Sequence, residues 1–219
     1  FLLLRTSPGP GEAKAWLEQF AVEFPGALHI AIGIDVTEAS SVDINAMTAT
    51  GLHFSRNSVL TAMTVHEPPQ PNHEATLRRL AGDDDWAQAA ELRAVLSAGE
   101  PGGEPAFLHA RLAAERAVTE AGHGSWYGAF ANGKLLAQLG LISDRSGIAR
   151  FQNVETHPAA RRKGLAGTLV WHAGRDGLNA GARTLVMVAD PKDAAIRVYR
   201  SVGFADAETQ VGFERPPQD

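Results

Sequence analysis

The chain has 219 residues, and with 44% hydrophobic and 21% charged residues it has enough apolar material to fold around a core. Its formal net charge of -5 argues against a general nucleic-acid-binding protein, because that role needs a basic face to displace counterions from phosphates. Cysteine is absent, which excludes disulfides, thiolate metal sites and a cysteine nucleophile, so any acyl transfer must proceed without a thio-acyl enzyme.

The first third of the chain predicts a small α/β unit in which strands and helices alternate. The hydrophobic pattern indicates strands at 1–6, 28–34 and 59–66, with helices at 12–24 and 41–50 between them. Pro68, Pro69 and Pro71 then preclude a helix and favour an extended linker. We therefore expect a half-domain at residues 1–66, a proline-rich linker at 67–72 and a larger domain at 73–219.

The larger domain is expected to begin with a strand, two helices and a β-hairpin, at residues 74–80, 83–97, 105–121, 126–131 and 135–142. Asn132-Gly133 joins the two hairpin strands and is a strong signal for a two-residue turn. Strand, helix, strand, helix and strand follow at residues 148–156, 163–180, 184–188, 194–202 and 208–214. Because Thr184–Val188 lacks polar alternation, as buried parallel strands do, residues 148–188 should form a strand-helix-strand crossover in a mixed sheet.

The start of the helix in this crossover has a composition suited to an anion. Three cations, Arg161–Lys163, stand where the positive end of the helix dipole disfavours cations by typically ~0.3–1 kcal/mol each. The small residues within Gly164–Gly167 would let phosphates approach free backbone N–H groups. A bound pyrophosphate would supply the missing negative charge, and a strand-to-helix turn with a solvated basic surface is the alternative.

Two sequence signatures in this region resemble those of a known family. Arg161–Ala166 reads RRKGLA and is similar to the R/Q-x-x-G-x-G/A acyl-CoA signature of the GNAT (GCN5-related N-acetyltransferase) superfamily. Ala195–Phe204 reads AIRVYRSVGF and resembles the family's second signature, A-x-x-x-Y-x-x-x-G-F, at the expected distance from the first. The order of elements over residues 74–215 also matches the family. The resemblance implies a mixed, largely antiparallel twisted sheet flanked by helices, preceded here by the smaller α/β half-domain.

The resemblance also implies acetyl-CoA as cosubstrate and a set of residues that contact it. The strand end would contribute the backbone N–H groups of Val154 and Thr156. The loop and helix start would contribute Arg161, Arg162, Lys163, Gly164, Leu165, Ala166, Gly167 and Thr168, and the region of the last helix Lys192 and Ala195. Lys192 departs from the family pattern, which often has asparagine there, so its coenzyme contact is in doubt. The eight histidines show no H-E-x-x-H pattern, so we expect no metal.

The family resemblance implies direct attack of a substrate amine on the thioester, without a covalent enzyme intermediate. Tyr199 would be the general acid that protonates the departing thiolate, and core packing beside Ile196 at i,i+3 spacing is its alternative. Glu155 is the first candidate for the general base, because strand alternation turns it away from its neighbours and towards a substrate cleft. It could equally be an ordinary solvated glutamate. His157 and a chain of water molecules are further candidates for the base.

These observations predict an N-acetyltransferase that acts on a primary amine of a small molecule or a protein. A catalytically weak acyl-CoA-binding or scaffold protein is the alternative, and a homodimer is compatible with either. We expect neither a nucleic-acid nor a membrane partner. No apolar run approaches the roughly 18 residues of a membrane span, so a cytoplasmic location is expected.

The first 66 residues resemble the second half of a GNAT domain in their order of elements. They contain no R/Q-x-x-G-x-G/A sequence. We therefore expect a degenerate, non-catalytic half-repeat that packs against the active domain, with an unrelated small α/β extension as the alternative.

Overall fold

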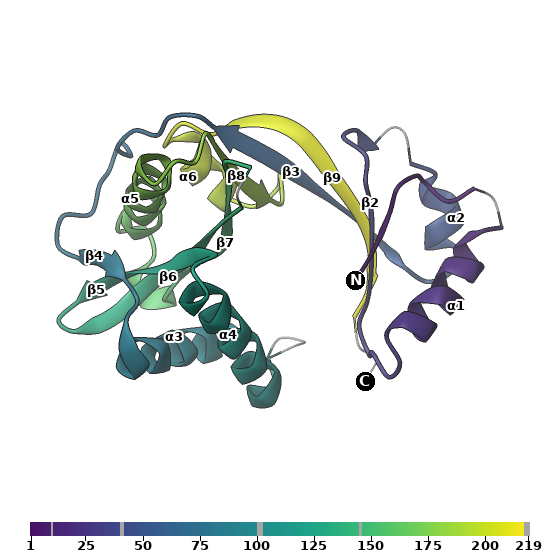
Figure 1. Cartoon of the computed structure of the whole chain (residues 1–219), viewed down its shortest axis with the longest axis horizontal. Helices are drawn as coiled ribbons and strands as arrows, with labels where there is room; N and C mark the ends of the chain where they lie inside the picture. The colour runs from purple at the N-terminus through teal and green to yellow at the C-terminus, as the bar shows by residue number, and fades with distance from the viewer. Residues whose placement is uncertain (10, 40–41, 100–102, 145, 217–219) are drawn as a thin grey trace. The chain divides into compact units, whose positions relative to one another are not determined.

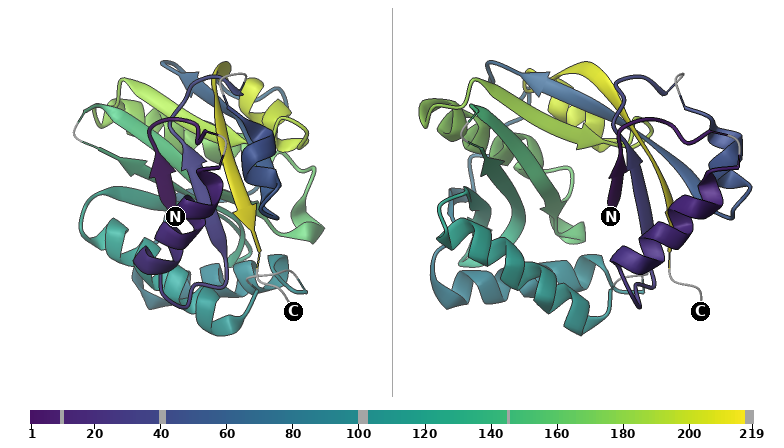
Figure 2. Two further views of the ribbon diagram at one scale, coloured as in Figure 1. Left: turned by 90° about the vertical axis from the view of Figure 1, so that its right-hand side faces the viewer. Right: turned by 45° about the vertical axis from the view of Figure 1, so that its right-hand side comes forward.

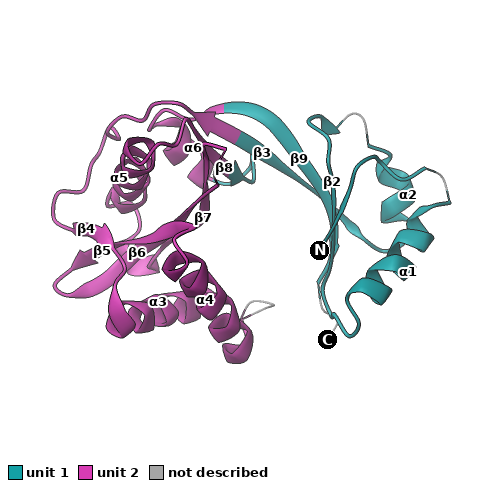
Figure 3. Ribbon diagram, viewed as in Figure 1, with its two compact units in different colours: residues 1–59, 188–193, 206–219 teal, residues 60–187, 194–205 magenta. Residues whose placement is uncertain are grey.

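The computed structural model describes residues 1–9, 11–39, 42–99, 103–144 and 146–216, and the chain folds into two compact units (Figure 1). Unit 1 comprises residues 1–59, 188–193 and 206–219, and unit 2 comprises residues 60–187 and 194–205 (Figure 3). The chain therefore first passes from unit 1 to unit 2 between Val59 and Leu60, and it crosses between the units again at 187/188, 193/194 and 205/206. The proline-rich segment 67–72, expected to link two domains, belongs to unit 2 in the structure.

Unit 1 is a small sheet with two helices. Its strands are β1 (Leu2–Leu4), β2 (Ile30–Ile34), β3 (His53–Ala62) and β9 (Ala205–Arg215), in the order β1-β2-β9-β3, although the last residues of β3 and the first of β9 belong to unit 2. Helix α1 (Ala13–Glu23) joins the parallel strands β1 and β2, and the short helix α2 (Ile44–Thr48) follows β2 (Figure 2). The core of this unit includes Phe20, Ile32, Met47 and Phe213.

One strand of unit 1 lies earlier in the chain than the sequence predicted. The expected strand at residues 59–66 is β3 at His53–Ala62 in the structure. The first half of β3 contains the polar residues Ser55, Arg56 and Asn57, so its sequence resembles a loop. None of these side chains is buried in the structure. Backbone pairing with β9 holds it in the sheet regardless, and Leu60 supplies the buried contact.

The described residues of unit 2 form five strands and four α-helices. Its strands are β4 (Thr76–Arg79), β5 (Gly124–Ala131), β6 (Lys134–Ser143), β7 (Ile148–Thr156) and β8 (Thr184–Ala189), in the order β8-β7-β6-β5-β4, although the last two residues of β8 belong to unit 1. The helices are α3 (Gly82–Leu96), α4 (Pro105–Glu120), α5 (Leu165–Asn179) and α6 (Ala195–Arg200). None of the helices in the described part of the chain is both long and apolar enough to cross a bilayer.

Two predictions about unit 2 are confirmed. Strands β5 and β6 form an antiparallel hairpin whose turn residues, Asn132 and Gly133, have φ values of 51° and 75°, as a hairpin turn of this length requires. Strands β7 and β8 pair in parallel through the crossover helix α5. The mixed α/β arrangement expected from the sequence is therefore present.

Helices cover both faces of the β5–β6–β7 sheet. On one face, α3 and α4 pack against the hairpin, and Trp86 of α3 lies 6.1 Å from Trp126 of β5 between ring centroids. On the other face lies α5, whose His172 makes an edge contact with Tyr127, the next residue of β5 (Figure 1). Neighbouring residues of one strand thus face opposite layers, as the strand period requires.

Candidate coenzyme site

The loop between β7 and α5 carries the predicted coenzyme-binding residues. A 3₁₀ turn at Pro158–Ala160 follows β7, and α5 begins at Leu165 after Gly164, which has a φ of 76°. The helix starts later than the predicted residue 163, because Arg162 and Gly164 both adopt positive φ values that no helix allows. No side chain of the described residues caps α5, which leaves first-turn N–H groups for an external acceptor.

The cations of this loop lie on the surface around the start of α5. Arg161, Arg162 and Lys163 are all exposed, and Ala166 in the first turn is half-buried. The guanidinium of Arg161 also donates from Nε to the carbonyl oxygen of Thr156, at 3.4 Å. The structure therefore brings the basic loop and the end of β7 together, as the sequence predicted.

The proline-rich segment lies directly against the loop. Asn72 donates from its backbone N–H to the hydroxyl of Thr168, and from Nδ2 to the carbonyl oxygen of Lys163, each at 2.8 Å. A Cβ added to Gly164 would lie 2.3 Å from the carbonyl oxygen of Gln70, and one added to Gly167 would lie 3.2 Å from Pro68. Glycine is needed at 164 to admit this segment, and the space beside Gly167 is tight.

The end of β7 separates from β8 beside this loop. Parallel pairing of the two strands runs from Ile148 opposite Thr184 to Arg150 opposite Val186, well before β7 ends at Thr156. Val154 and Thr156 lie in the part of β7 beyond this pairing, and both are half-buried. Along this part of β7 the backbone is therefore not paired with β8.

A β-bulge interrupts β7 at the same place. Gln138 of β6 lies opposite Glu155 and Gly140 opposite Gln152, so Leu139 faces two residues, Asn153 and Val154. Asn153 has a φ of 47°, which is uncommon for a residue with a side chain. The bulge interrupts simple strand alternation, on which the assignment of Glu155 to the substrate cleft rested.

Glu155 is bound by two side chains of the α3 side. Its carboxylate accepts from Nε and Nη2 of Arg93, at 3.2 and 3.3 Å, and from Nε2 of Gln138 at 2.6 Å. Arg93 is only 3% exposed, whereas the Glu155 side chain is 20% exposed. Glu155 is therefore part of a nearly buried ion pair and not an ordinary solvated glutamate.

Arg93 connects this pair to α4. Its Nη1 donates to Glu115 at 2.6 Å, and the other carboxylate oxygen of Glu115 accepts from Nδ2 of Asn153 at 2.7 Å. Burial opposes the charge on Arg93, but the Glu155 and Glu115 carboxylates outweigh that effect and raise the pKa of the guanidinium. The network thus holds both neighbours of Val154 on the α3–α4 side of the sheet.

Tyr199 and Ala195 lie on α6, which packs beside the start of α5. Val198 of α6 lies 3.4 Å from where a Cβ on Gly167 would be, so α6 is close to the basic loop. Tyr199 is 6% exposed, which shows that most of its ring is packed in the interior. Lys192, another predicted contact, is exposed and belongs to unit 1, where its backbone N–H donates to Asp190.

His157 makes a local hydrogen bond that sets its tautomer. The backbone N–H of Ala159 donates to Nδ1 of His157 at 3.2 Å. Nδ1 is therefore the unprotonated nitrogen, and Nε2 carries the proton of the neutral ring. Within the ranges that the structure describes, no group of three or more His, Asp or Glu side chains is placed to hold a metal ion.

Comparison with known proteins decides which family has this arrangement. The family model described as the acetyltransferase (GNAT) family matches residues 89–204, a range that includes both the basic loop and Tyr199. The chain belongs to the acetyltransferase (GNAT) family. Among curated proteins, no significant sequence match was found.

Several solved structures, GNAT proteins among them, resemble this chain over most of its length. A GCN5-related N-acetyltransferase from Sphaerobacter thermophilus has a TM-score of 0.65 and 19% identity, covering 95% of this chain and 69% of its own. A functionally unknown conserved protein from Staphylococcus epidermidis has a TM-score of 0.70 at 11% identity, with coverages of 99% and 84%. A tandem GNAT protein from the clavulanic acid biosynthesis pathway has a TM-score of 0.58 at 14% identity, with coverages of 86% and 65%. At these identities the similarity shows the GNAT fold alone.

Sequence reasoning missed the polar partners of Glu155 in this GNAT domain. Arg93 lies on α3 among Trp86, Ala89 and Leu92, which are all buried and follow helical spacing. A charged residue within an apolar stripe predicts a buried ion pair, because an unpaired buried charge is strongly unfavourable. That signal was available in the sequence, but its acidic partners lie on α4 and β7, too far along the chain to identify from a pattern.

Proposed function

We propose that the protein is an N-acetyltransferase that transfers the acetyl group of acetyl-CoA directly to a primary amine. One observation carries this proposal: the uncapped start of α5, surrounded by Arg161–Lys163, lies beside the edge of β7 that has separated from β8. A cationic loop suits a pyrophosphate, and a free strand edge suits the amide groups of a pantetheine arm. The acceptor is a small-molecule or protein amine.

In this proposal the predicted coenzyme residues have different roles. Arg161, Arg162 and Lys163 bind the phosphates together with backbone N–H groups from Gly164 to Ala166, while Val154 and Thr156 bind the pantetheine arm and the acyl carbonyl. Gly167 and Thr168 support the loop, because both are buried and contact the segment 68–72. Ala195 and Lys192 are kept as coenzyme contacts on the family resemblance alone.

The chemistry requires one proton to leave the amine and one to reach the thiolate. We assign the second step to the Tyr199 hydroxyl, because α6 packs at the same end of α5 as the basic loop. Glu155 stays a prediction for the first step, but both oxygens of its carboxylate already accept hydrogen bonds from Arg93 and Gln138, so an amine would have to compete with these donors. His157 has no free lone pair, since Nδ1 accepts from Ala159. We therefore favour proton removal through water.

We also propose that the first third of the chain is a degenerate half-repeat of the same fold. The succession β1-α1-β2-α2-β3, with β1 and β2 parallel, has the same order as β7-α5-β8-α6-β9, with β7 and β8 parallel. Before α1, the N–H of Gly9 donates to the Glu12 carboxylate at 2.8 Å. A protein carboxylate therefore takes an N–H donor in the loop that would correspond to the anion-binding loop, which supports a non-catalytic role.

The test measures coenzyme binding and turnover separately. Calorimetry of acetyl-CoA with the double variant Arg161→Ala/Arg162→Ala should show a Kd raised by about tenfold or more, as expected when charge-assisted hydrogen bonds to phosphate are lost. Lys14→Ala, an exposed cation on α1, is the control and should leave the Kd unchanged. Unchanged affinity in the folded double variant would rule out this loop as the coenzyme site.

Release of free CoA in the presence of a panel of amines then separates the enzyme from the alternative. Turnover with at least one amine is expected. Tight acetyl-CoA binding without turnover of any amine would favour an acyl-CoA-binding or scaffold protein.

A further inference from the structure

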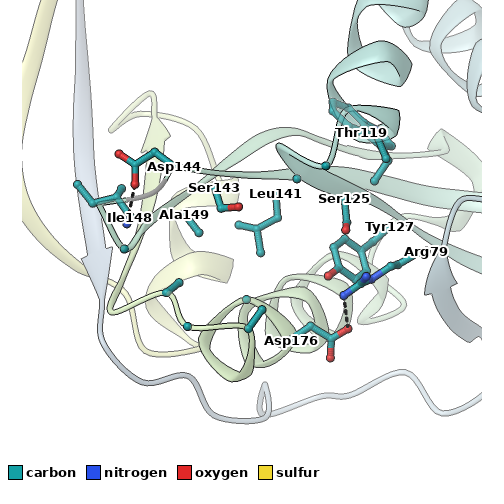
Figure 4. Close-up of a pocket in the computed structure, with 18 of the residues that line it drawn as sticks. Arg79, Thr119, Ser125, Tyr127, Leu141, Ser143, Asp144, Ile148, Ala149 and Asp176 are labelled. Atoms are coloured by element: carbon teal, nitrogen blue, oxygen red, sulfur yellow. Dashed lines mark hydrogen bonds and ion pairs between the residues drawn. The ribbon is translucent and has the colours of Figure 1, made fainter.

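Unit 2 contains a cavity that the coenzyme site does not use. It has a volume of about 670 Å³ and lies at the C-terminal end of α5, against the first residues of β5 and β7 and the last of β6 (Figure 4). Ligand cavities in proteins typically measure about 300–1,000 Å³, so its size suits a small molecule.

This cavity is remote from the proposed chemistry. Its floor includes Ser143 and Ala149, which pair with each other where β7 begins, whereas the coenzyme edge lies near Thr156 at the other end of that strand. The two places are about 20 Å apart along β7, at roughly 3.3 Å per residue. They also lie at opposite ends of α5. The cavity is therefore a separate site.

Small residues make the space. Ser125, Ser143 and Ala149 come from three neighbouring strands and occupy the floor beside Leu141, as Figure 4 shows. Above them, a Cβ added to Gly177 of α5 would lie 2.7 Å from the Leu141 side chain, so glycine lets the helix pack closely against the sheet. The helix ends soon afterwards at Asn179. Larger side chains at these positions would fill the cavity.

One end of the cavity presents both signs of charge. Arg79 lies 3.9 Å from Asp176, at the limit of an ion pair, and the guanidinium of Arg79 is 5.6 Å from the ring centre of Tyr127. Burial raises the pKa of the Tyr127 hydroxyl, more than Arg79 lowers it, so this hydroxyl stays a hydrogen-bond donor at neutral pH. The negative end of the α5 dipole lies beside Asp176 and favours a cation there.

The opposite end of the cavity also has charged side chains, Asp144 and Arg183, but both already have hydrogen-bond partners. Asp144 accepts from the hydroxyl of Ser146 at 2.7 Å and from the N–H of Ile148 at 3.0 Å, and Arg183 donates to the carbonyl oxygen of Ser146. The charged lining residues are thus two arginines and two aspartates, which balance. A ligand with a single charge would upset this balance, whereas a ligand with one charge of each sign would keep it.

We propose that this cavity binds a free α-amino acid, with its ammonium group at Asp176, its carboxylate at Arg79 and its side chain over Leu141 towards Asp144. The long contact between Arg79 and Asp176 makes room for such a ligand. When the amino acid binds, Arg79 and Asp176 each give up this weak contact and form a shorter one with the ligand. Tyr127 and Ser125 add hydroxyl groups beside the carboxylate. This inference does not depend on the proposed acetyltransferase reaction.

Calorimetric titration of the whole chain with the free L-amino acids, without coenzyme, tests the proposal. At least one should bind with one-to-one stoichiometry. Asp176→Asn and Arg79→Gln should each weaken that binding by about 10–100-fold, the range for loss of a hydrogen bond to a charged group. Alkylamines and carboxylates that carry only one of the two charges should bind more weakly by a similar factor.

The control is Arg175→Gln, because Arg175 adjoins Asp176 in sequence but stacks over Trp171 outside the cavity, so this variant should bind as wild type does. An amino acid bound instead at the acceptor site would keep its affinity in Asp176→Asn. The proposal is overturned if no amino acid binds, if both cavity variants bind as well as wild type, or if a singly charged analogue binds equally. Should Asp176→Asn not fold, Arg79→Gln decides. Acetyl-CoA affinity, measured in parallel, should be unchanged in either variant.

Discussion

Replacing Arg93 with methionine should destabilise the protein by about 3 kcal/mol, because the change leaves Glu115 and Glu155 close together without their shared cation. Removal of one partner from a buried ion pair typically costs about 3–5 kcal/mol. The two carboxylates keep 13% and 20% of their side-chain exposure, and residual contact with water places this case at the lower end of the range. Methionine fills most of the volume of the arginine stem, so little of the effect comes from a cavity.

The pH dependence of the variant follows from the same argument. Protonation of one unpaired carboxylate would relieve the repulsion in the folded state, so the folded variant would bind protons more readily than its unfolded chain. Stability of such a state falls as pH rises. The deficit of Arg93→Met relative to wild type should therefore be largest at neutral pH and should shrink as the pH is lowered towards 5, about where an unperturbed glutamate begins to protonate.

Urea unfolding followed by tryptophan fluorescence measures this, since Trp86 and Trp126 pack in the same core as α3. The matched comparison is Arg93→Met combined with Glu115→Gln and Glu155→Gln, which removes the unpaired charges and should recover much of the lost stability. A difference between Arg93→Met and wild type of less than about 0.5 kcal/mol, typical of an ordinary surface change, would refute the reasoning. So would a triple variant as unstable as Arg93→Met.

Two other predictions concern the coenzyme end of the domain. Tyr199→Phe should lower kcat by a factor near the low end of the ~10²–10⁴-fold range for a lost general acid, while acetyl-CoA affinity changes little. The loss in kcat should be smaller at lower pH. An unaltered kcat, measured where chemistry limits turnover, would assign Tyr199 to core packing. Gly164→Ala should reduce the free energy of unfolding by more than Gly133→Ala does. The φ values of 76° and 75° impose the same backbone strain of about 1–2 kcal/mol on alanine at either position. Only the Cβ added at 164 meets a neighbour, which is the carbonyl oxygen of Gln70. Equal losses in urea unfolding would show that segment 68–72 does not press on the loop.

Local signals explain why much of the fold could be predicted. Asn132-Gly133 identifies its hairpin because only residues tolerant of positive φ close a two-residue turn. Strand β7 was predicted with the bounds that the structure shows, 148–156, because His157-Pro158 marks its end so clearly. The family signatures likewise place the basic loop and Tyr199 in a GNAT domain, which the family match confirms.

The parts that escaped prediction depend on contacts between residues far apart in the chain. The first half of β3 is too polar to read as a strand, and only pairing with β9 makes it one. Asn153 in the bulge donates to Glu115, which Arg93 also binds, and no pattern near residue 153 reveals these partners. Strand alternation therefore suggested an open cleft for Glu155, where the structure has an ion pair.

The proline-rich segment has a consequence for how this domain could be cut or rearranged in evolution. Residues 68–72 form a wall of the basic loop, because they pack against Gly164 and Gly167 and because Asn72 donates hydrogen bonds to Thr168 and to the carbonyl oxygen of Lys163. From the sequence, a gene break placed after the prolines would fall between two domains, yet it would separate this segment from the basic loop of unit 2. A break upstream of Pro68 would keep the segment with the loop that it supports, although β9 would still lose its pairing with β2.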